Sequence, residues 1–422
     1  MKICFLNSTD TGGGAANACR RQAEALYRSG ADITFLAQKQ KGESKPYSKY
    51  FIQNKFQKVL YLIRHLRNER FLKSYPDYQH NNFSAAYYAA NILDHPAVKE
   101  ADIIHIHWMN DSFLNAKQIR AIATSGKKIV WTLHDMWSFT GGCHYSAACN
   151  GYTESCGKCP VLGSKESNDL SARQWKDKQE QWKDINMHIL TPSYWLGSCA
   201  AQSTLFKKYH RSVIRYALDT EVFVPLNKAE LRLKFNIRPE AKLILFGAVN
   251  ATKDTRKGFK YLVAALKHLH IRNLDFAKDI ELVIFGSAGD DQLQLPFKTH
   301  FLGNLTTDQA IVEAYNLADV FATPSLEDNL PNTVFESMAC GVPVVGFNIG
   351  GIPEMIDHQQ NGYTAQPLSS DSLADGLQWV LEDEVRYQQL SSAGRAKIVR
   401  EYDYALIAKE HMQLYASLLE SH

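Results

Sequence analysis

Short apolar segments alternate with stretches of helical periodicity along the chain, and this alternation limits the fold more than any other feature of the sequence. Such apolar runs are typical of strands buried on both faces of a parallel sheet, with crossover helices between them. We expect strands at 2–7, 32–37, 102–107, 128–133 and 188–193 in a first series, and at 242–248, 281–286, 318–325 and 342–347 in a second. The pattern predicts an α/β protein with two Rossmann-like, doubly wound units.

The length of the chain agrees with two units, because 422 residues correspond to two or three domains at ~100–200 residues each. We place an N-terminal unit at 1–213 and a C-terminal unit at 214–400, with a candidate hinge at 214–225. A last helix, within 401–422, could pack on either unit or return to the N-terminal one.

Composition excludes several classes of protein. Hydrophobic residues make up 45% and charged residues 22%, which argues against a disordered chain. The net charge of +3 is small for a general nucleic-acid binder. No apolar run reaches the ~18–20 residues of a membrane span, and the N-terminus lacks the apolar core of a signal peptide. We therefore expect a cytoplasmic protein whose eight cysteines are thiols or metal ligands rather than disulfides.

The segment 45–73 is strongly basic. It holds eight Lys or Arg residues against one acid, Glu69, and aromatic residues lie among them. A basic helix with aromatic side chains can lie on an anionic membrane surface, here the inner face of the plasma membrane. The alternative is a helix with one solvated face that packs over the first unit.

The loop after the first strand holds three consecutive glycines, Gly12, Gly13 and Gly14. Glycines there let backbone N–H groups approach an anion at a helix N-terminus. A dinucleotide fingerprint would also need a third spaced glycine and an acid that ends the second strand. Asn17 stands at the glycine position and the strand ends at Ala37-Gln38, which disfavours NAD or FAD. A tight turn without a ligand explains the loop equally well.

Cations and carboxylates follow the strands of the second series. Lys253, Arg256 and Lys257 precede a helix, where cations could hold a pyrophosphate. Asp328 and Glu336 lie eight residues apart, and carboxylates can accept paired hydrogen bonds from vicinal sugar hydroxyls. A third turn, GGIPEMI at 350–356, also leads from glycines into a helix.

Together and in this order, these motifs resemble those of glycosyltransferase family 4, which has the GT-B architecture of two facing Rossmann-like domains with a cleft between them. The segment from Asp328 to Glu336 resembles the family's E-x7-E signature, and RKG at 256–258 resembles its phosphate-binding lysine motif. TLHD (132–135) resembles its N-domain histidine turn, and TPSYWL (191–196) and 217–225 resemble its interdomain segments.

The resemblance implies transfer of a sugar from a UDP- or GDP-linked donor with retention at the anomeric carbon. Lys257 would neutralise the pyrophosphate, Asp328 would lie near the donor sugar and Glu336 would hold the ribose hydroxyls. His134 would contact the transferred sugar. The remaining implied donor contacts are the loop Gly12, Gly13 and Gly14, the base-reading stretch Gly303, Asn304 and Leu305, and Arg256, Glu327, Asn329 and Leu330.

The sequence departs from the family pattern in two places. The first acid is Asp328 with Glu327 beside it, so which of the two contacts the donor sugar stays open. Ala248, rather than a nearby arginine, follows Gly247, and Arg256 or Lys253 could supply that charge. No metal is required for the chemistry, because Lys257 and helix N-termini can carry the phosphate charge.

Four cysteines fall within 17 residues: Cys143, Cys149, Cys156 and Cys159. The C-x2-C spacing of the last two is typical of zinc knuckles, and His144 could replace one thiol. We expect a structural zinc; the alternatives are free buried thiols or disulfides.

Three functions remain in competition. The leading hypothesis is a glycosyltransferase of cell-surface polysaccharide synthesis, such as lipopolysaccharide or capsule, acting on a glycan or lipid-linked acceptor. The alternatives are a GT-B sugar-nucleotide epimerase or phosphorylase, and a non-catalytic protein that binds a nucleotide-sugar. Acceptor-dependent release of the nucleoside diphosphate separates transferase from binding protein.

Overall fold

The computed structural model of the protein describes residues 1–422 except 77, 79–81, 249–251, 253, 288–293 and 421–422. Lys253 therefore lies outside the described residues. The chain forms two compact units, Met1–Ala217 with Tyr404–His422, and Leu218–Asp403. Each unit is a parallel sheet covered by helices, so the predicted α/β class with two Rossmann-like units is confirmed.

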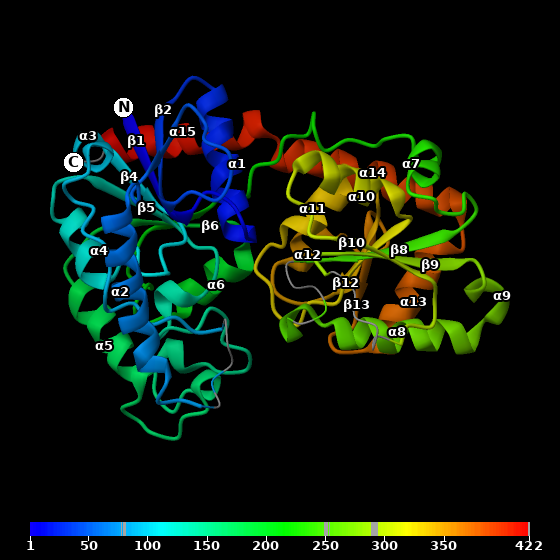
Figure 1. The fold of residues 1–422 in the computed structure, drawn as a ribbon, viewed down its shortest axis with the longest axis horizontal. Coiled ribbons are helices and arrows are strands. Elements are labelled where there is room, and N and C mark those ends of the chain that lie inside the picture. The colour runs from blue at the N-terminus through cyan, green and yellow to red at the C-terminus, as the bar shows by residue number, and fades with distance from the viewer. Residues whose placement is uncertain (77, 79–81, 249–251, 253, 288–293, 421–422) are drawn as a thin grey trace. The chain divides into compact units, whose positions relative to one another are not determined.

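The sheet of the first unit has seven strands in the order β3-β2-β1-β4-β5-β6-β7, and all of its pairings are parallel (Figure 1). The strands are β1 (Lys2–Thr9), β2 (Asp32–Lys39), β3 (Ser48–Tyr50), β4 (Ile103–Ile106), β5 (Lys128–Thr132), β6 (His188–Thr191) and β7 (Arg211–Val213). The order of the strands reverses between β1 and β4. Ligands of open α/β sheets bind at such a reversal, outside the carboxyl ends of the strands.

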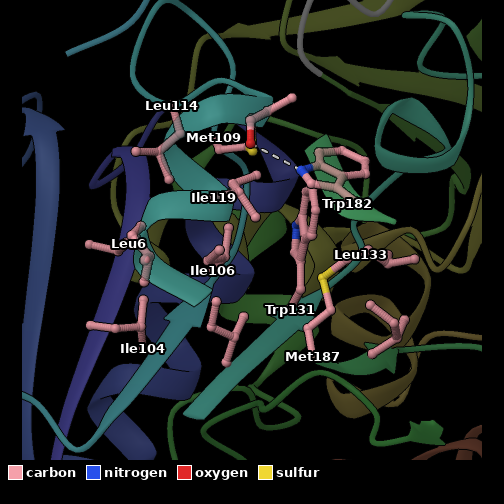
Figure 2. Close-up of a cluster of buried hydrophobic side chains, with 14 of the residues drawn as sticks. Leu6, Ile104, Ile106, Met109, Leu114, Ile119, Trp131, Leu133, Trp182 and Met187 are labelled. Carbon is pink, nitrogen blue, oxygen red and sulfur yellow. Dashed lines mark hydrogen bonds between the residues drawn. The ribbon is translucent and has the colours of Figure 1, made fainter. Parts of the chain in front are cut away.

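Helices bury both faces of this sheet. They are α1 (Gly14–Arg28), α2 (Lys55–Leu72), α3 (Pro96–Glu100), α4 (Ala116–Ala123), α5 (Leu170–Trp182), α6 (Tyr194–Gln202) and α15 (Tyr404–Glu420). α1 and α15 cover one face. On the other face α4 and α5 pack over β4 and β5, where Trp131 and Trp182 meet edge to face with ring centroids 5.5 Å apart (Figure 2). The Trp182 indole donates to the carbonyl of Ala116 at 3.1 Å, which satisfies the polar atom of a buried ring.

The second unit repeats this plan with six parallel strands in the order β10-β9-β8-β11-β12-β13. The strands are β8 (Lys242–Gly247), β9 (Ile280–Phe285), β10 (Thr299–Gly303), β11 (Val320–Thr323), β12 (Val344–Phe347) and β13 (Gly362–Ala365). The helices are α7 (Lys228–Lys234), α8 (Phe259–Arg272), α9 (Leu274–Ala277), α10 (Asp308–Leu317), α11 (Asn332–Ala339), α12 (Ile352–Met355), α13 (Ser370–Leu381) and α14 (Glu384–Tyr402). α8 and α13 cover one face, and α10, α11 and α14 lie over the other (Figure 1). Here the order reverses between β8 and β11.

The unit boundary lies at Ala217–Leu218, a few residues after the expected one at 213. The last helix, α15, belongs to the first unit. All nine strands of the two predicted series are present, and β3, β7, β10 and β13 are additional to them. β3 and β7 are three-residue strands at the edges of the sheet with partly exposed side chains, so they carry no apolar run.

The basic segment 45–73 contains β3 and the helix α2. Asn54 caps α2 by accepting a hydrogen bond from the backbone of Gln57. Among the described helices, none combines the length and the apolar character needed to cross a membrane.

The backbone conformation of Gly258 leads to a first prediction. Gly258 has φ +70°, and a Cβ there would lie 1.8 Å from the carbonyl oxygen of Pro324, whereas at Gly303, with φ +65°, it would meet no atom within 4 Å. Gly303→Ala should lower the free energy of unfolding by about 1–2 kcal/mol, because alanine must adopt a left-handed backbone conformation. Gly258→Ala should cost clearly more, because the loop after β11 must also move. Denaturant-dependent hydrogen exchange in the second unit measures both costs, and equal losses would contradict the close approach.

Candidate functional site

An ion pair joins two loops at the carboxyl edge of the second sheet. Lys257 ends a 3-10 turn (Thr255–Lys257) after β8, and Asp328 follows β11, so the pair spans the reversal of strand order. Lys257 Nζ donates to Asp328 Oδ2 at 2.6 Å, and Arg256 Nη1 lies 3.6 Å from the same oxygen. The structure thus brings together the cations and the first acid that the sequence predicted separately.

Backbone contacts fix the loops around this pair. Leu326 N donates to the carbonyl of Arg256 at 2.8 Å, and the Arg256 guanidinium donates to the carbonyl of Glu327 at 3.1 Å. Gly350 approaches Asp328 so closely that a Cβ there would lie 2.0 Å from its carbonyl oxygen. These contacts join the described residues 254–258 to the loops after β11 and β12.

The four charged side chains that pair at this edge carry equal numbers of positive and negative charges. Arg256 also pairs with Asp254 at 3.1 Å, so two cations stand against two carboxylates. Burial alone would raise the pKa of Asp328, but the charges of Lys257 and Arg256 and the hydrogen bond from Lys257 hold it below its ordinary value. Asp328 stays ionised, and Lys257 is the cation that can stand between this carboxylate and a phosphate.

The second acid, Glu336, lies inside α11. Its side chain is buried and accepts a hydrogen bond from the hydroxyl of Tyr315 on α10 at 2.9 Å. A buried carboxylate needs such a partner. Tyr315 was not singled out by the sequence, because an aromatic residue in an apolar helix looks like any core residue. The predicted contact of Glu336 with ribose stays a prediction.

The other predicted donor contacts of the second unit fall in two places, the loop after β11 and the end of β10. Asn329 and Leu330 are buried in the loop after β11. Gly303 ends β10, and its carbonyl accepts a hydrogen bond from Gly286 N at 2.7 Å; Asn304 and Leu305 follow it, two strands from the reversal.

The first unit has its own polar edge at the reversal between β1 and β4. The glycine loop follows β1, and a Cβ on Gly13 or Gly14 would meet no atom within 4 Å. The loop after β4 is tied to β1, because Trp108 N donates to Asn7 Oδ1 at 2.8 Å. The open space lies beside Gly13 and Gly14, whereas a Cβ on Gly12 would lie 3.3 Å from the side chain of Lys41.

His134, after β5, sits in a chain of buried polar groups. Its Nε2 lies 3.1 Å from His107 Nδ1, and its Nδ1 lies 2.8 Å from the hydroxyl of Tyr216. Burial lowers the pKa of His134 to about 4, against the opposing charge of Asp135, so the ring is neutral near pH 7. These partners fix the orientation of the imidazole. Tyr216 was missed because it lies in the segment expected to be a hinge.

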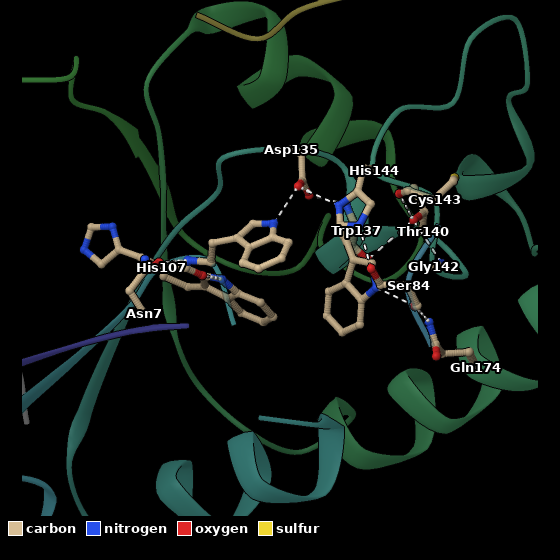
Figure 3. Close-up of polar contacts among 12 residues, drawn as sticks. Asn7, Ser84, His107, Asp135, Trp137, Thr140, Gly142, Cys143, His144 and Gln174 are labelled. Carbon is tan, nitrogen blue, oxygen red and sulfur yellow. Dashed lines mark hydrogen bonds and ion pairs between the residues drawn. The ribbon is translucent and has the colours of Figure 1, made fainter. Parts of the chain in front are cut away.

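Asp135, the next residue, links His134 to the cysteine-rich segment. Its Oδ2 lies 2.7 Å from His144 Nδ1 and accepts from the Trp108 indole at 3.1 Å (Figure 3). His144 Nε2 lies 2.8 Å from the hydroxyl of Ser84. Both ring nitrogens of His144 thus have hydrogen-bond partners, and its role as a substitute metal ligand stays a prediction.

The four clustered cysteines border one small cavity of about 20 Å³, whose lining includes Cys143, Cys149, Cys156 and Cys159. They are not disulfide-bonded. As the side chains lie, the described residues contain no group of three or more His, Cys, Asp or Glu side chains already arranged to hold a metal ion.

A larger cavity of about 530 Å³ lies elsewhere in the second unit. Lys242, Asp319 and Val342 line it, and these residues precede or begin β8, β11 and β12. It therefore opens at the amino edge of the sheet, opposite to the predicted donor residues.

Comparison with known proteins is consistent with this geometry. Residues 12–154 match the model of Glycosyltransferase Family 4, and residues 227–397 match that of Glycosyl transferases group 1. An uncharacterized glycosyltransferase of Methanocaldococcus jannaschii is 25% identical over 75% of this chain and 83% of its own length. The phosphatidyl-myo-inositol mannosyltransferase of Mycobacterium leprae is 27% identical to this chain. The match covers 43% of this chain and 48% of that protein. Anabaena HepE, solved with UDP and glucose, shares the fold with a TM-score of 0.67 at 15% identity over 99% of this chain and 100% of its own.

The buried histidines set a second prediction. Burial lowers the pKa of His105, His107, His134 and His411. The unfolded chain takes up these protons below pH ~6.5 and the folded unit does not, so stability is lost as the pH falls from 7 to 5, by up to about 1.4 kcal/mol per pH unit for each histidine.

Urea unfolding followed by tryptophan fluorescence measures this loss, since six of the seven tryptophans lie in the first unit. His411→Gln should reduce the dependence of the unfolding free energy on pH by the contribution of one histidine. A stability that does not change between pH 7 and pH 5 would contradict the neutral, buried histidines.

Proposed function

Because the chain belongs to the family 4 glycosyltransferases, we propose that it transfers a sugar, with retention of anomeric configuration, from a UDP- or GDP-linked donor to a lipid-linked glycan acceptor. The acceptor would be a precursor of a cell-surface polysaccharide such as lipopolysaccharide or capsule, and the reaction would take place at the inner face of the plasma membrane.

One observation carries this proposal: Lys257 and Arg256 stand at the carboxyl edge of the sheet, on the reversal of strand order, with Asp328 against them. This edge is where open α/β sheets bind nucleotides. Transfer leaves negative charge on the departing diphosphate, and cations that are already in place lower the cost of that charge. The UDP found with HepE supports a nucleoside diphosphate of this kind.

We assign roles to the residues accordingly. Lys257 binds the diphosphate and stabilises it as it leaves, while Asp328 orients the ammonium and lies near the donor sugar. Glu336 holds the ribose hydroxyls, and neutral His134 contacts the transferred sugar. The acceptor hydroxyl attacks from the face that the diphosphate leaves, and a phosphate oxygen takes its proton. In this proposal no metal takes part in the chemistry.

The helix α2 supports the membrane part of the proposal. Its exposed apolar side chains are Phe56, Val59, Leu60, Leu62, Ile63 and Leu66. Its exposed basic side chains are Lys55, Lys58, Arg67 and Arg70. On the other side Tyr61 donates to Asp111 at 2.9 Å and Asn68 donates to Ser112 at 2.8 Å, which attach the helix to its unit. An apolar face flanked by cations fits the surface of an anionic bilayer.

Lys257→Ala tests the donor site. We expect turnover to fall about 10²–10³-fold, because the developing phosphate charge loses its main cation. Release of UDP or GDP from a panel of nucleotide-sugars, with membrane lipid extract as acceptor, measures the rate. Lys260→Ala is the matched control, since Lys260 is exposed one turn further on in α8. Unchanged turnover in Lys257→Ala would refute the assignment; donor binding without acceptor-dependent release would favour the non-catalytic alternative.

A double substitution, Phe56→Glu with Leu66→Glu, tests the membrane surface. These side chains are 71% and 66% exposed, so the change should leave the fold intact while weakening binding to vesicles with anionic lipid at least ~10-fold. Leu233→Glu, at an 82% exposed position on the second unit, is the control. Vesicle sedimentation gives the result, and equal binding by all three proteins would show that α2 is not the contact.

A further inference from the structure

We propose that Cys143, Cys149, Cys156 and Cys159 bind one structural zinc ion as thiolates. This inference does not depend on the proposed function, because the metal content can be measured without any transfer assay.

The first argument is the shared cavity. The four cysteines come from a segment without long regular structure, yet all four border a single cavity of about 20 Å³. That volume is about the room for one water-sized particle. The thiols do not yet form a closed cage, as the absence of a ready-made metal group among the described residues shows. Because all four side chains border the same cavity, we expect zinc to draw the sulfurs together by rotation about their Cα–Cβ bonds.

The second argument is the backbone around the sulfurs. Gly141 N donates to Cys156 Sγ at 3.1 Å, and Gly151 N lies 3.4 Å from Cys149 Sγ. An N–H group directed at a sulfur holds that sulfur in a fixed orientation, as the outer partners of metal ligands do. The C-x2-C turn contains Lys158 with φ +48°, a conformation that side-chain-bearing residues rarely adopt and that persists where surrounding structure enforces it.

The third argument is the charge of Lys178 on α5. Its side chain is 1% exposed, lies 3.4 Å from the centroid of the Trp137 ring and donates to the carbonyls of Trp137 and Thr140. No described carboxylate lies within ion-pair distance of its ammonium. Burial lowers the pKa of this ammonium to about 7, and negative charge on Cys156 and Cys143 would act against that shift. A buried cation needs an anion, and a zinc ion with four thiolates carries a net charge of −2.

Four thiolates close the coordination sphere of zinc, which makes the ion structural rather than catalytic. Its effect would reach His134 through the chain. Cys143 precedes His144, whose ring contacts Asp135, and Asp135 adjoins His134. The ion would therefore hold in place the segment that supports the polar edge of the first unit.

Metal analysis of the purified full-length chain, prepared under reducing conditions without added metal, tests the proposal. We expect about one zinc per chain, as a closed Cys4 site requires. A thiol-blocking mercurial should release this zinc as the four thiols react. Protein refolded with Co²⁺ should show the thiolate-to-metal charge-transfer and d–d bands of a tetrahedral site.

Variants locate the site. Cys156→Ser should lose the zinc, and Cys199→Ser, a partly buried cysteine on α6, should keep it. If Cys156→Ser does not fold, the metal content and cobalt spectrum of the wild type still decide. Wild type without zinc, zinc retained in a folded Cys156→Ser variant, iron in place of zinc, or a thiol titration that shows disulfides would each overturn the proposal.

Discussion

The carboxylate of Asp328, buried between Lys257 and Arg256, is the interaction on which the arrangement of the second unit's polar edge depends. An unpaired carboxylate would be costly there, so the two loops that carry the partners must meet. The left-handed turn at Gly258 allows that meeting, because only a residue without a side chain fits against Pro324. The same ion pair keeps a cation at the point where an open α/β sheet binds its ligand. In the function that we propose, stability and phosphate binding therefore depend on the same side chains.

The first unit also has a polar edge where its strand order reverses, but different side chains form it. It repeats the order of strands, but its polar edge is built from neutral histidines and hydroxyls rather than ion pairs. Burial holds His107 and His134 uncharged, and the Tyr216 hydroxyl orients the second ring. A neutral, oriented imidazole suits hydrogen bonding to a sugar, whereas paired cations suit a diphosphate. The two units thus differ in the chemistry that they can offer to a ligand.

The sequence was sufficient for the strands with apolar runs and for the α/β class, because burial on both faces leaves a direct mark on composition. The two predicted series lacked the four edge strands β3, β7, β10 and β13, since short or half-exposed strands leave no such mark. Lys257 and Asp328 were each predicted, but their pairing joins positions 71 residues apart and depends on the packing of two loops. The contact of His144 with Asp135 was not predicted, because its nearness in sequence to the cysteines gives no sign of it.

The central claim is that a nucleoside diphosphate binds at the edge formed by the loops after β8, β11 and β12. Hydrogen exchange of the wild-type chain, measured with and without UDP or GDP, tests it most directly. We expect one of the two nucleotides to slow exchange in 254–259, 324–332 and 350–353. Protection confined to the cavity at the amino edge of the sheet, or no protection by either nucleotide, would contradict it.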